Sequence, residues 1–301
     1  MEFTLENIDD MLLEDLFSLK TQITKLIFLL QTLMLLPKQR ICEKCKDTMY
    51  IKKEATIDDY IFKCALCRRK ISLRRGTFFE GSKLTLWQIF ALIYVDIFDI
   101  YMSYEQLERQ FHISSHSTTC DWQNFIREVY LDYFNTHRER IGGPGIIVQI
   151  DESQICKRKY HRGRVLVNQN VWIVGGIDSN GNIFQALTEI RNRQILEGII
   201  TQHVHGGSIL WTDCWRGYNN LCNLYYSHET VNHSIEFKTQ HGVHTNRIEA
   251  IWGAIKRKFR HITNKRPQLI GSYLAEYQFK RKFREKKFSA YIKTINEIYR
   301  H

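Results

Sequence analysis

Two closely spaced pairs of cysteines constrain the fold of this chain more than any other feature. Cys42 and Cys45 form the first pair, and Cys64 and Cys67 form the second. Each C-x2-C turn presents two thiolates, and two such turns together surround one tetrahedral zinc ion. The β-hairpin between the pairs is too short to be stable without metal. We therefore predict a structural zinc site, with an iron–sulfur cluster or incidental buried cysteines as the alternatives.

The other cysteines indicate the compartment. They are scattered singly along the chain, as Cys120, Cys156, Cys214 and Cys222. One metal-type cluster without a disulfide framework or a secretory signal predicts an intracellular, reducing compartment. This would be the nucleus in a eukaryote and the cytoplasm or nucleoid in a bacterium. The most apolar run, residues 23–36, falls short of the roughly 18 residues of a spanning helix, so we expect no membrane partner.

The balance of charge points to a polyanion. Lys and Arg number 43 against 32 Asp and Glu, which gives a net charge of +11. Such an excess favours nucleic acid as the partner, and we expect double-stranded DNA. Six basic residues around the cysteine pairs suit this contact, although a solvated basic surface would also explain them. They are Lys44, Lys46, Arg68, Arg69, Arg74 and Arg75.

Hydrophobic periodicity divides the chain into segments of different character. Leucine-rich helical patterns come first, short alternating strands surround the cysteines, and three further helical patterns follow. After "IGGPG" the pattern changes to that of an α/β domain, and the end of the chain is strongly basic. The predicted segments are an N-terminal helical segment (1–38), a zinc ribbon (39–80), a helical, helix-turn-helix-like DNA-binding domain (81–140), an α/β domain (141–285) and a basic C-terminal tail (286–301).

Within the α/β domain, strands and helices alternate. Residues 171–178 and 182–190 are predicted strands, joined by the hairpin signal "DSNG". The other predicted elements are strands at 146–151, 208–213 and 225–231, a helix at 192–204 and a helix from about Thr245. This order predicts a mixed α/β sheet with one hairpin.

Three carboxylates stand where such a sheet builds its sites. Asp151 and Asp213 each end an apolar strand, and Glu249 lies on the last helix. The three converge if that helix crosses the sheet at the strand ends. Carboxylate oxygens are the ligands that magnesium prefers, and two such ions would serve an in-line phosphoryl transfer. Taken singly, Asp151 could instead form a strand-end turn, and Asp213 could cap the short helix that follows it.

Neighbouring residues receive simpler interpretations. Asp178 is explained by the hairpin turn, and Trp215 and Tyr218 by packing. Glu152 adjoins Asp151, but strand alternation sends it to the other face of the sheet, so we leave it out of the ligand set. Trp252 is expected to anchor the last helix to the sheet.

At this point the motifs resemble a known family. "IDES", "ILWTDCWRGY" and "HTNRIEAIWGAIKR", with the upstream "FFEGSKLTLWQI" and the cysteine pairs, resemble Merlin-type DNA transposases and the related bacterial insertion-sequence transposases with an aspartate-aspartate-glutamate site. The resemblance covers about residues 40–285. It implies an RNase H-like catalytic domain that uses magnesium or manganese to cut and rejoin DNA at terminal inverted repeats.

By position, the resemblance assigns the catalytic acids to Asp151, Asp213 and Glu249. Lys256 occupies the place of a basic residue that follows the third acid in many such transposases. Asn246 matches the asparagine of "HTN", which some relatives use as a ligand, so its role beside Glu249 stays open. Both are expected to contact DNA.

The basic segment between the first two strands is also expected to meet DNA phosphates, unless it is an ordinary solvated loop. Its residues are Lys157, Arg158, Lys159, His161, Arg162 and Arg164. Synapsis of two DNA ends implies a homodimer. Two other functions remain in competition: a domesticated, non-catalytic DNA-binding protein derived from a transposase, and an RNase H-like nuclease with a different nucleic-acid substrate.

Overall fold

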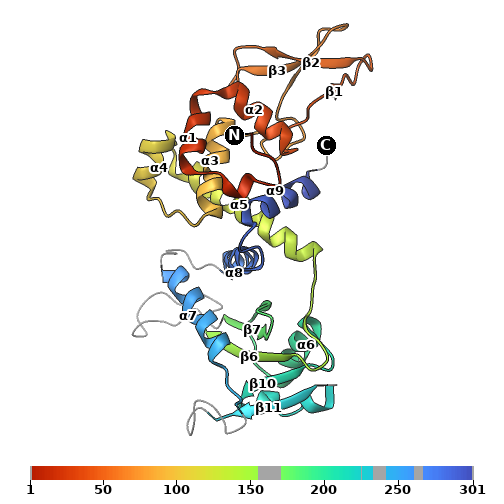
Figure 1. The fold of residues 1–301 in the computed structure, drawn as a ribbon, viewed down its shortest axis with the longest axis vertical. Coiled ribbons are helices and arrows are strands. Elements are labelled where there is room, and N and C mark those ends of the chain that lie inside the picture. Colours follow the sequence, from red (N-terminus) through yellow and green to blue (C-terminus); the bar gives the residue numbers. More distant parts are fainter. Residues whose placement is uncertain (1, 155–170, 225, 233–241, 261–266, 300–301) are drawn as a thin grey trace. The chain divides into compact units, whose positions relative to one another are not determined.

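The chain folds into two compact units. The computed structural model describes residues 2–154, 171–224, 226–232, 242–260 and 267–299. The first unit comprises residues 1–133 together with 283–301, and the second comprises 134–282. Each unit buries its own apolar side chains, and Figure 1 names the elements of both.

The first unit opens with short helices, as the leucine-rich pattern predicts. They are the 3₁₀ helices η1 (Ile8–Asp10) and η2 (Leu19–Thr21) and the α-helices α1 (Leu13–Ser18) and α2 (Ile23–Thr32). Helix α2 buries Leu26 and Leu30, one turn apart, on the face that packs into the unit. The chain then enters a small antiparallel sheet.

This sheet contains the two cysteine pairs. Its strands β1 (Arg40–Ile41), β2 (Thr48–Lys53), β3 (Tyr60–Cys64) and β4 (Lys70–Ser72) pair in sequence order. Its apolar core is small, with Met49 on β2 opposite Cys64 on β3 and Phe62 fully buried. Strands this short and few bury little apolar area, which agrees with a fold that depends on metal.

Three helices follow, as predicted within residues 84–134. They are α3 (Leu86–Ile97), α4 (Tyr104–Phe111) and α5 (His116–Thr136). Helices α3 and α4 begin with reciprocal capping boxes, Thr85 with Gln88 and Ser103 with Gln106. Within the described part of the chain, none of the helices combines the length and the apolar character that a bilayer span needs.

The segment that we expected as a basic tail contains a packed helix instead. Helix α9 (Lys287–Ile298) belongs to the first unit and buries Phe288, Tyr291, Ile292 and Ile295. This spacing gives one apolar face. An interpretation based on charge alone misses this face, because lysines and arginines surround it. Asp9 accepts hydrogen bonds from the Phe288 and Ser289 amides and so caps α9 from the other end of the sequence.

The second unit is built on a five-stranded mixed sheet. Its strands are β6 (Ile147–Gln154), β7 (Trp172–Asp178), β8 (Ile183–Thr188), β10 (Ile209–Asp213) and β11 (Ser227–Val231), in the order β11-β10-β6-β7-β8. Strands β6, β7 and β8 are antiparallel, whereas β10 runs parallel to both β6 and β11. A short parallel pair, β5 (Ile141–Gly142) and β9 (Val204–His205), lies outside this sheet. The predicted mixed α/β sheet is confirmed.

The hairpin between β7 and β8 forms where "DSNG" predicts it. Asp178 is buried, and its carboxylate accepts hydrogen bonds from the backbone and side-chain amides of Asn182. Gly181 takes the left-handed conformation that the turn needs, with φ of +95°. The turn explanation of Asp178 is therefore confirmed.

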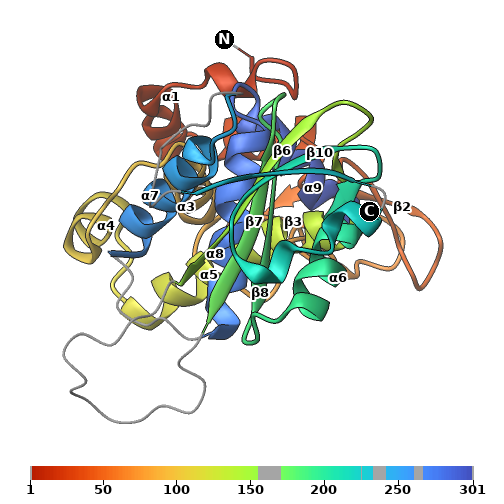
Figure 2. The same cartoon turned by 90° about the horizontal axis from the view of Figure 1, so that it is seen from below.

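Helices cover both faces of the large sheet. Helix α6 (Arg193–His203) and the 3₁₀ helices η3 (Arg216–Tyr218) and η4 (Leu221–Leu224) pack on the face to which Val148 and Ile150 point. Helices α7 (Asn246–Arg260) and α8 (Pro267–Lys282) pack on the other face. Figures 1 and 2 show α6 and α7 on opposite sides of β6 and β7. Gln149 and Asp151 alternate with Val148 and Ile150, so they face α7.

Candidate functional site

The four cysteines come together as predicted. Their ligand atoms all lie within 4.8 Å of one another. The Sγ atoms of Cys42 and Cys67 are 3.4 Å apart, and those of Cys45 and Cys64 are 3.2 Å apart. The two pairs occupy equivalent turns, because the residue after the second cysteine of each pair has a left-handed backbone, at φ of 61° and 59°.

The donor set fits a zinc ion. Backbone hydrogen bonds, first from Cys45 and then from Lys44, outweigh burial and lower the pKa of Cys42 to about 6. A backbone hydrogen bond from Cys67 likewise lowers the pKa of Cys64. At Cys42 and Cys64 these amides favour the thiolate, which is the form that binds metal, whereas the hydrogen bond with Cys64 raises the pKa of Cys45 to about 12. Four protein thiolates fill a tetrahedral shell, so this cluster can hold a structural zinc.

Half of the basic residues expected around the cysteines make contacts within the protein. Arg74 is buried, pairs with both carboxylate oxygens of Asp58 and donates to two backbone carbonyls. Our expectation of a DNA contact is therefore wrong for Arg74, because the donors that would meet a phosphate are used inside the fold. Arg69 and Arg75 both pair with Glu43, at 2.7 and 3.5 Å.

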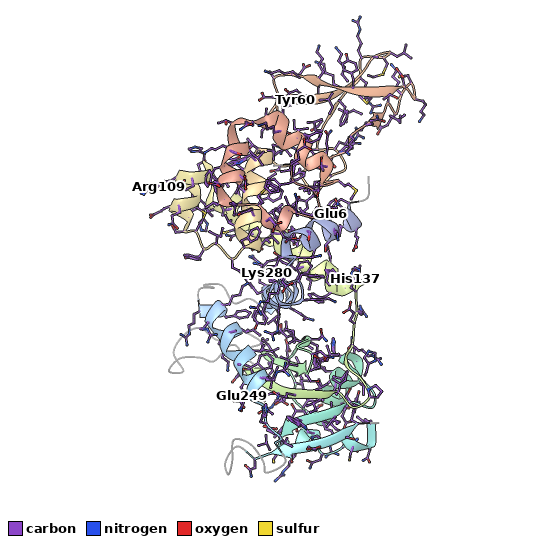
Figure 3. The ribbon with its side chains drawn as sticks, viewed as in Figure 1. Glu6, Tyr60, Arg109, His137, Glu249 and Lys280 are labelled. Carbon is purple, nitrogen blue, oxygen red and sulfur yellow. The ribbon has the colours of Figure 1, made fainter. Side chains whose placement is uncertain are left out.

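The three predicted acids stand on three elements of the second unit. Asp151 lies within β6 and pairs with Gly175 of β7, Asp213 ends β10, and Glu249 lies in the first turn of α7. Strand β6 continues to Gln154, so Asp151 does not end its strand as we expected. Figure 3 shows Glu249 at the end of α7 that lies beside the strands.

The parallel register brings the two aspartates alongside each other. Trp211 of β10 pairs with Gln149 of β6, and each aspartate follows two residues later on its own strand. Residues two apart on a strand share a face, so both carboxylates belong to the face that α7 covers. We expected both aspartates at strand ends. In the structure they lie at the same level of the neighbouring strands β6 and β10.

The electrostatics of Asp151 show that the acids share one neighbourhood. Burial raises the pKa of Asp151 to about 6. Hydrogen bonds from the Glu152 backbone and from Trp252 oppose this rise, while the charges of Asp213 and Glu249 add to it. Carboxylates that disfavour one another's ionisation are suited to a cation. Among the described residues, the four cysteines form a group close enough to hold a metal ion, whereas Asp151, Asp213 and Glu249 do not form such a group in this structure.

Two polar contacts fix helix α7 on strand β6. The Oε1 atom of Gln149 accepts hydrogen bonds from the Arg247 and Ile248 amides, at 3.0 and 3.3 Å, and so caps the helix from the sheet. The indole Nε1 of Trp252 donates to Oδ2 of Asp151 at 2.9 Å. These contacts set the register of Glu249 against Asp151.

A glycine makes room for that indole. A Cβ atom at Gly175 would lie 2.6 Å from Cη2 of Trp252 and 2.9 Å from the backbone oxygen of Phe184. Any larger residue at this position would displace the ring that holds Asp151. The sequence predicted Trp252 as an anchor, whereas the roles of Gln149 and Gly175 were not predicted. A polar residue two positions before the aspartate, inside an otherwise apolar strand, is the signal that could have revealed Gln149.

The structure describes some of the other predicted site residues. Asn246 and Lys256 are exposed on α7, and Glu249 is exposed and accepts a hydrogen bond from the Thr245 hydroxyl at 2.9 Å. The basic segment between β6 and β7 lies outside the described residues, so the structure gives no position for the expected DNA contacts there. Those residues are Lys157, Arg158, Lys159, His161, Arg162 and Arg164.

Glu152 points away from the acids, as alternation predicts. Its side chain contacts Tyr218, whose buried ring belongs to the core under α6. The packing interpretation of Tyr218 is confirmed. The sequence did not reveal that the Tyr218 hydroxyl donates a hydrogen bond to the buried carboxylate of Glu152.

Comparison with known proteins gives one family. The search of curated proteins finds no match. Residues 141–282 match the family model described as the ISXO2-like transposase domain. The matched segment contains the whole five-stranded sheet, helices α6 to α8 and all three acids. It is slightly less than half of the 301-residue chain, and it supports an insertion-sequence transposase family for the second unit.

Proposed function

We propose that the protein is a DNA transposase of the Merlin-related type, which cuts DNA at terminal inverted repeats and joins the ends to target DNA. The observation that carries the proposal is that the charges of Asp213 and Glu249 both act on the buried carboxylate of Asp151, within a segment that matches a transposase domain. A mixed sheet of three antiparallel strands followed by two parallel strands supports an RNase H-like catalytic fold.

The three carboxylates would hold divalent metal ions, magnesium or manganese. When bound, such ions activate the attacking water or 3′-hydroxyl and stabilise the leaving oxygen. The protein contributes the placement of its ligands. Gln149 and Trp252 fix α7 on β6, and the Trp252 indole orients the carboxylate of Asp151 by holding Oδ2.

Exposed groups on α7 would contact the DNA. Lys256 lies two helical turns beyond Glu249, on the same face, where its charge would meet a backbone phosphate. Asn246 precedes Glu249 by one turn and would contact DNA or share the ligand role. The basic residues 157–164 would add phosphate contacts from the segment between β6 and β7. The ribbon and helices of the first unit would recognise the DNA ends, with a homodimer joining two ends.

A domesticated DNA-binding protein is the less supported alternative. Phosphate binding needs cations, and it gives no reason to bury a carboxylate beside two others in a basic protein. The raised pKa of Asp151, caused first by burial, is a cost that a cation site would offset. A catalytic role explains this arrangement, whereas simple binding does not.

A cleavage assay tests the proposal. The full chain is incubated with a labelled duplex that carries the terminal repeats flanking its coding sequence, in magnesium and in calcium. We expect magnesium-dependent cleavage by the wild type, none by Glu249→Gln and wild-type cleavage by Glu229→Gln. Glu229 is an exposed carboxylate on β11 and controls for the loss of one charge. Binding without cleavage by the wild type would instead support domestication.

A further inference from the structure

Glu152 is a buried carboxylate outside the proposed metal-binding set. Its side chain is 3% exposed. The hydroxyl of Tyr218 donates to its Oε1 atom at 2.6 Å, and Nη1 of Arg191 lies 3.8 Å from its Oε2 atom. Removing a carboxylate from water is unfavourable unless partners replace the lost hydration. These two contacts therefore form a polar centre in the core under α6.

Arg191 is held in place by two indole rings. Its guanidinium carbon lies 4.2 Å from the ring centroid of Trp172 and 4.5 Å from that of Trp215. Stacking between aromatic faces fixes the plane of a guanidinium group. Trp172 begins β7 and pairs with Gln154 at the end of β6, so this clamp joins the end of β6 to the segment that follows Asp213.

The segment after Asp213 depends on the same residues. The Trp215 amide donates to Oδ1 of Asp213 at 3.0 Å, which leaves this oxygen fixed by the turn. Gly217 allows the Trp215 ring to fold over the backbone, because a Cβ there would lie 2.1 Å from Cζ3 of the ring. Tyr218 then reaches back to Glu152, the residue next to Asp151.

Pairing with Val231 of β11 places Asp213 in the sheet but does not tie it to β6. The last paired residues of β10 and β6 are Trp211 and Gln149, two positions before the aspartates. Beyond them, the described contacts that tie the Asp213 turn to β6 are those of Glu152 with Tyr218 and with Arg191. Glu152, Tyr218 and Arg191 thus connect the strand of Asp151 to the turn of Asp213. They do so from the face of the sheet opposite the three acids.

We infer that Glu152 is a positioning residue, which sets the separation of Asp151 and Asp213 by anchoring the Asp213 turn through Tyr218 and Arg191. The inference rests on the proposed function. Groups that orient metal ligands from behind change metal affinity or activity by about 10-fold to 100-fold when they are replaced. Loss of this link should therefore raise the metal concentration that half-maximal cleavage needs. This rise should exceed that of a control variant with an equal loss of stability.

The test compares Tyr218→Phe and Glu152→Gln with Tyr226→Phe in the full, zinc-loaded chain. Tyr226 is buried in the same core, and its hydroxyl donates to the Val204 carbonyl, away from the acids. We expect the magnesium concentration for half-maximal cleavage to rise about 10-fold or more in Tyr218→Phe and in Glu152→Gln. It should stay unchanged in Tyr226→Phe, even where the thermal midpoint falls equally.

A double variant shows whether the two residues act through one link. Glu152→Gln with Tyr218→Phe should have a metal requirement no higher than the worse single variant, because both remove the same connection. Should Tyr218→Phe fail to fold, Arg191→Ala replaces it, since the Arg191 side chain is 35% exposed. A metal requirement like that of Tyr226→Phe in all these variants would overturn the inference.

Manganese binding separates this inference from the proposed function. Binding is followed by electron paramagnetic resonance of Mn²⁺ titrated into each protein without DNA. Weaker binding by Tyr218→Phe, with a wild type that cleaves no DNA, would support the positioning role and reject the transposase. Equal binding by wild type and Tyr218→Phe, or none by either, would overturn the positioning role whatever the cleavage assay shows.

Discussion

The indole Nε1 of Trp252 on α7 donates a hydrogen bond to Oδ2 of Asp151 on β6, across 2.9 Å. This contact joins the helix that carries the third acid to the strand that carries the first. A phenylalanine at position 252 keeps most of the packing and removes the donor.

We expect Trp252→Phe to lower the cleavage rate about 10-fold at fixed magnesium, because the Asp151 carboxylate loses the group that orients it. Single-turnover cleavage measures this. Trp211→Phe is the matched control. Trp211 lies on the same face, and its buried indole N–H has no partner in the described part of the chain, so its loss removes no hydrogen bond. Equal rates for both variants would contradict the role of the Trp252 contact.

Gln149 should stabilise the second unit through the start of α7. Gln149→Leu leaves the Arg247 and Ile248 amides without their acceptor. We expect a loss of about 1–2 kcal/mol in the free energy of unfolding, as for a lost helix cap. Urea unfolding followed by circular dichroism measures it. Gln194→Leu, at an exposed position of α6, should change the stability by less than about 0.5 kcal/mol.

A buried ion-pair cluster should make the second unit sensitive to acid. Glu276 of α8 accepts hydrogen bonds from Lys258 of α7 and from Lys280. Burial alone would raise the pKa of Glu276, but the charges of Lys280 and Lys258 lower it to about 2. Because the folded pKa lies below the ordinary value of 4.5, the stabilisation is complete above about pH 4.5 and is lost as the pH falls towards 2.

The loss between pH 5 and pH 3 should be on the order of 2 kcal/mol. Unfolding by urea at both pH values measures it in the wild type and in Glu276→Gln. The variant should be less stable at pH 5, because two lysines lose their partner, and its stability should fall less on acidification. An equal fall in both proteins would show that Glu276 does not carry the acid sensitivity.

Metal removal should unfold the ribbon. We expect about one zinc per chain by mass spectrometry and less in Cys64→Ser, because three thiolates hold the ion more weakly. Cys222→Ser, which replaces an exposed single cysteine, should retain full zinc. Amide exchange over β2 and β3 should become fast after chelation, since the sheet has little core of its own. Slow exchange in the metal-free protein would contradict a structural role for zinc.

The sequence patterns predicted the helices and strands better than they predicted the contacts between these elements. The cysteine spacing specified a cluster that the structure brings together, because both pairs lie in local turns. Most strands and helices of the second unit were also predicted from apolar periodicity, but helix α8 was not, because its sequence has no clear apolar face and the segment was interpreted only as basic. The exact extent of β6 was not, because polar residues follow Asp151 and the pairing of Ser153 with Ile173 is a non-local contact.

The burial of polar residues was harder to predict from the sequence than the helices and strands. Sequence placed Glu152 on the right face but could not show that Tyr218 and Arg191 would join it there, since these three residues are distant in the chain. Arg74 looked like a surface residue because its partner, Asp58, is identified only by the fold. Helix α9 was hidden because its apolar spacing is embedded in basic residues.

A change of metal preference at Asp213 tests the proposed metal site most directly. In Asp213→Cys a softer thiolate replaces a carboxylate, which should weaken magnesium binding and favour manganese. We expect this variant not to cleave terminal-repeat DNA in magnesium and to regain part of the wild-type cleavage in manganese. Cleavage in magnesium at the wild-type rate would contradict the assignment of Asp213 as a metal ligand.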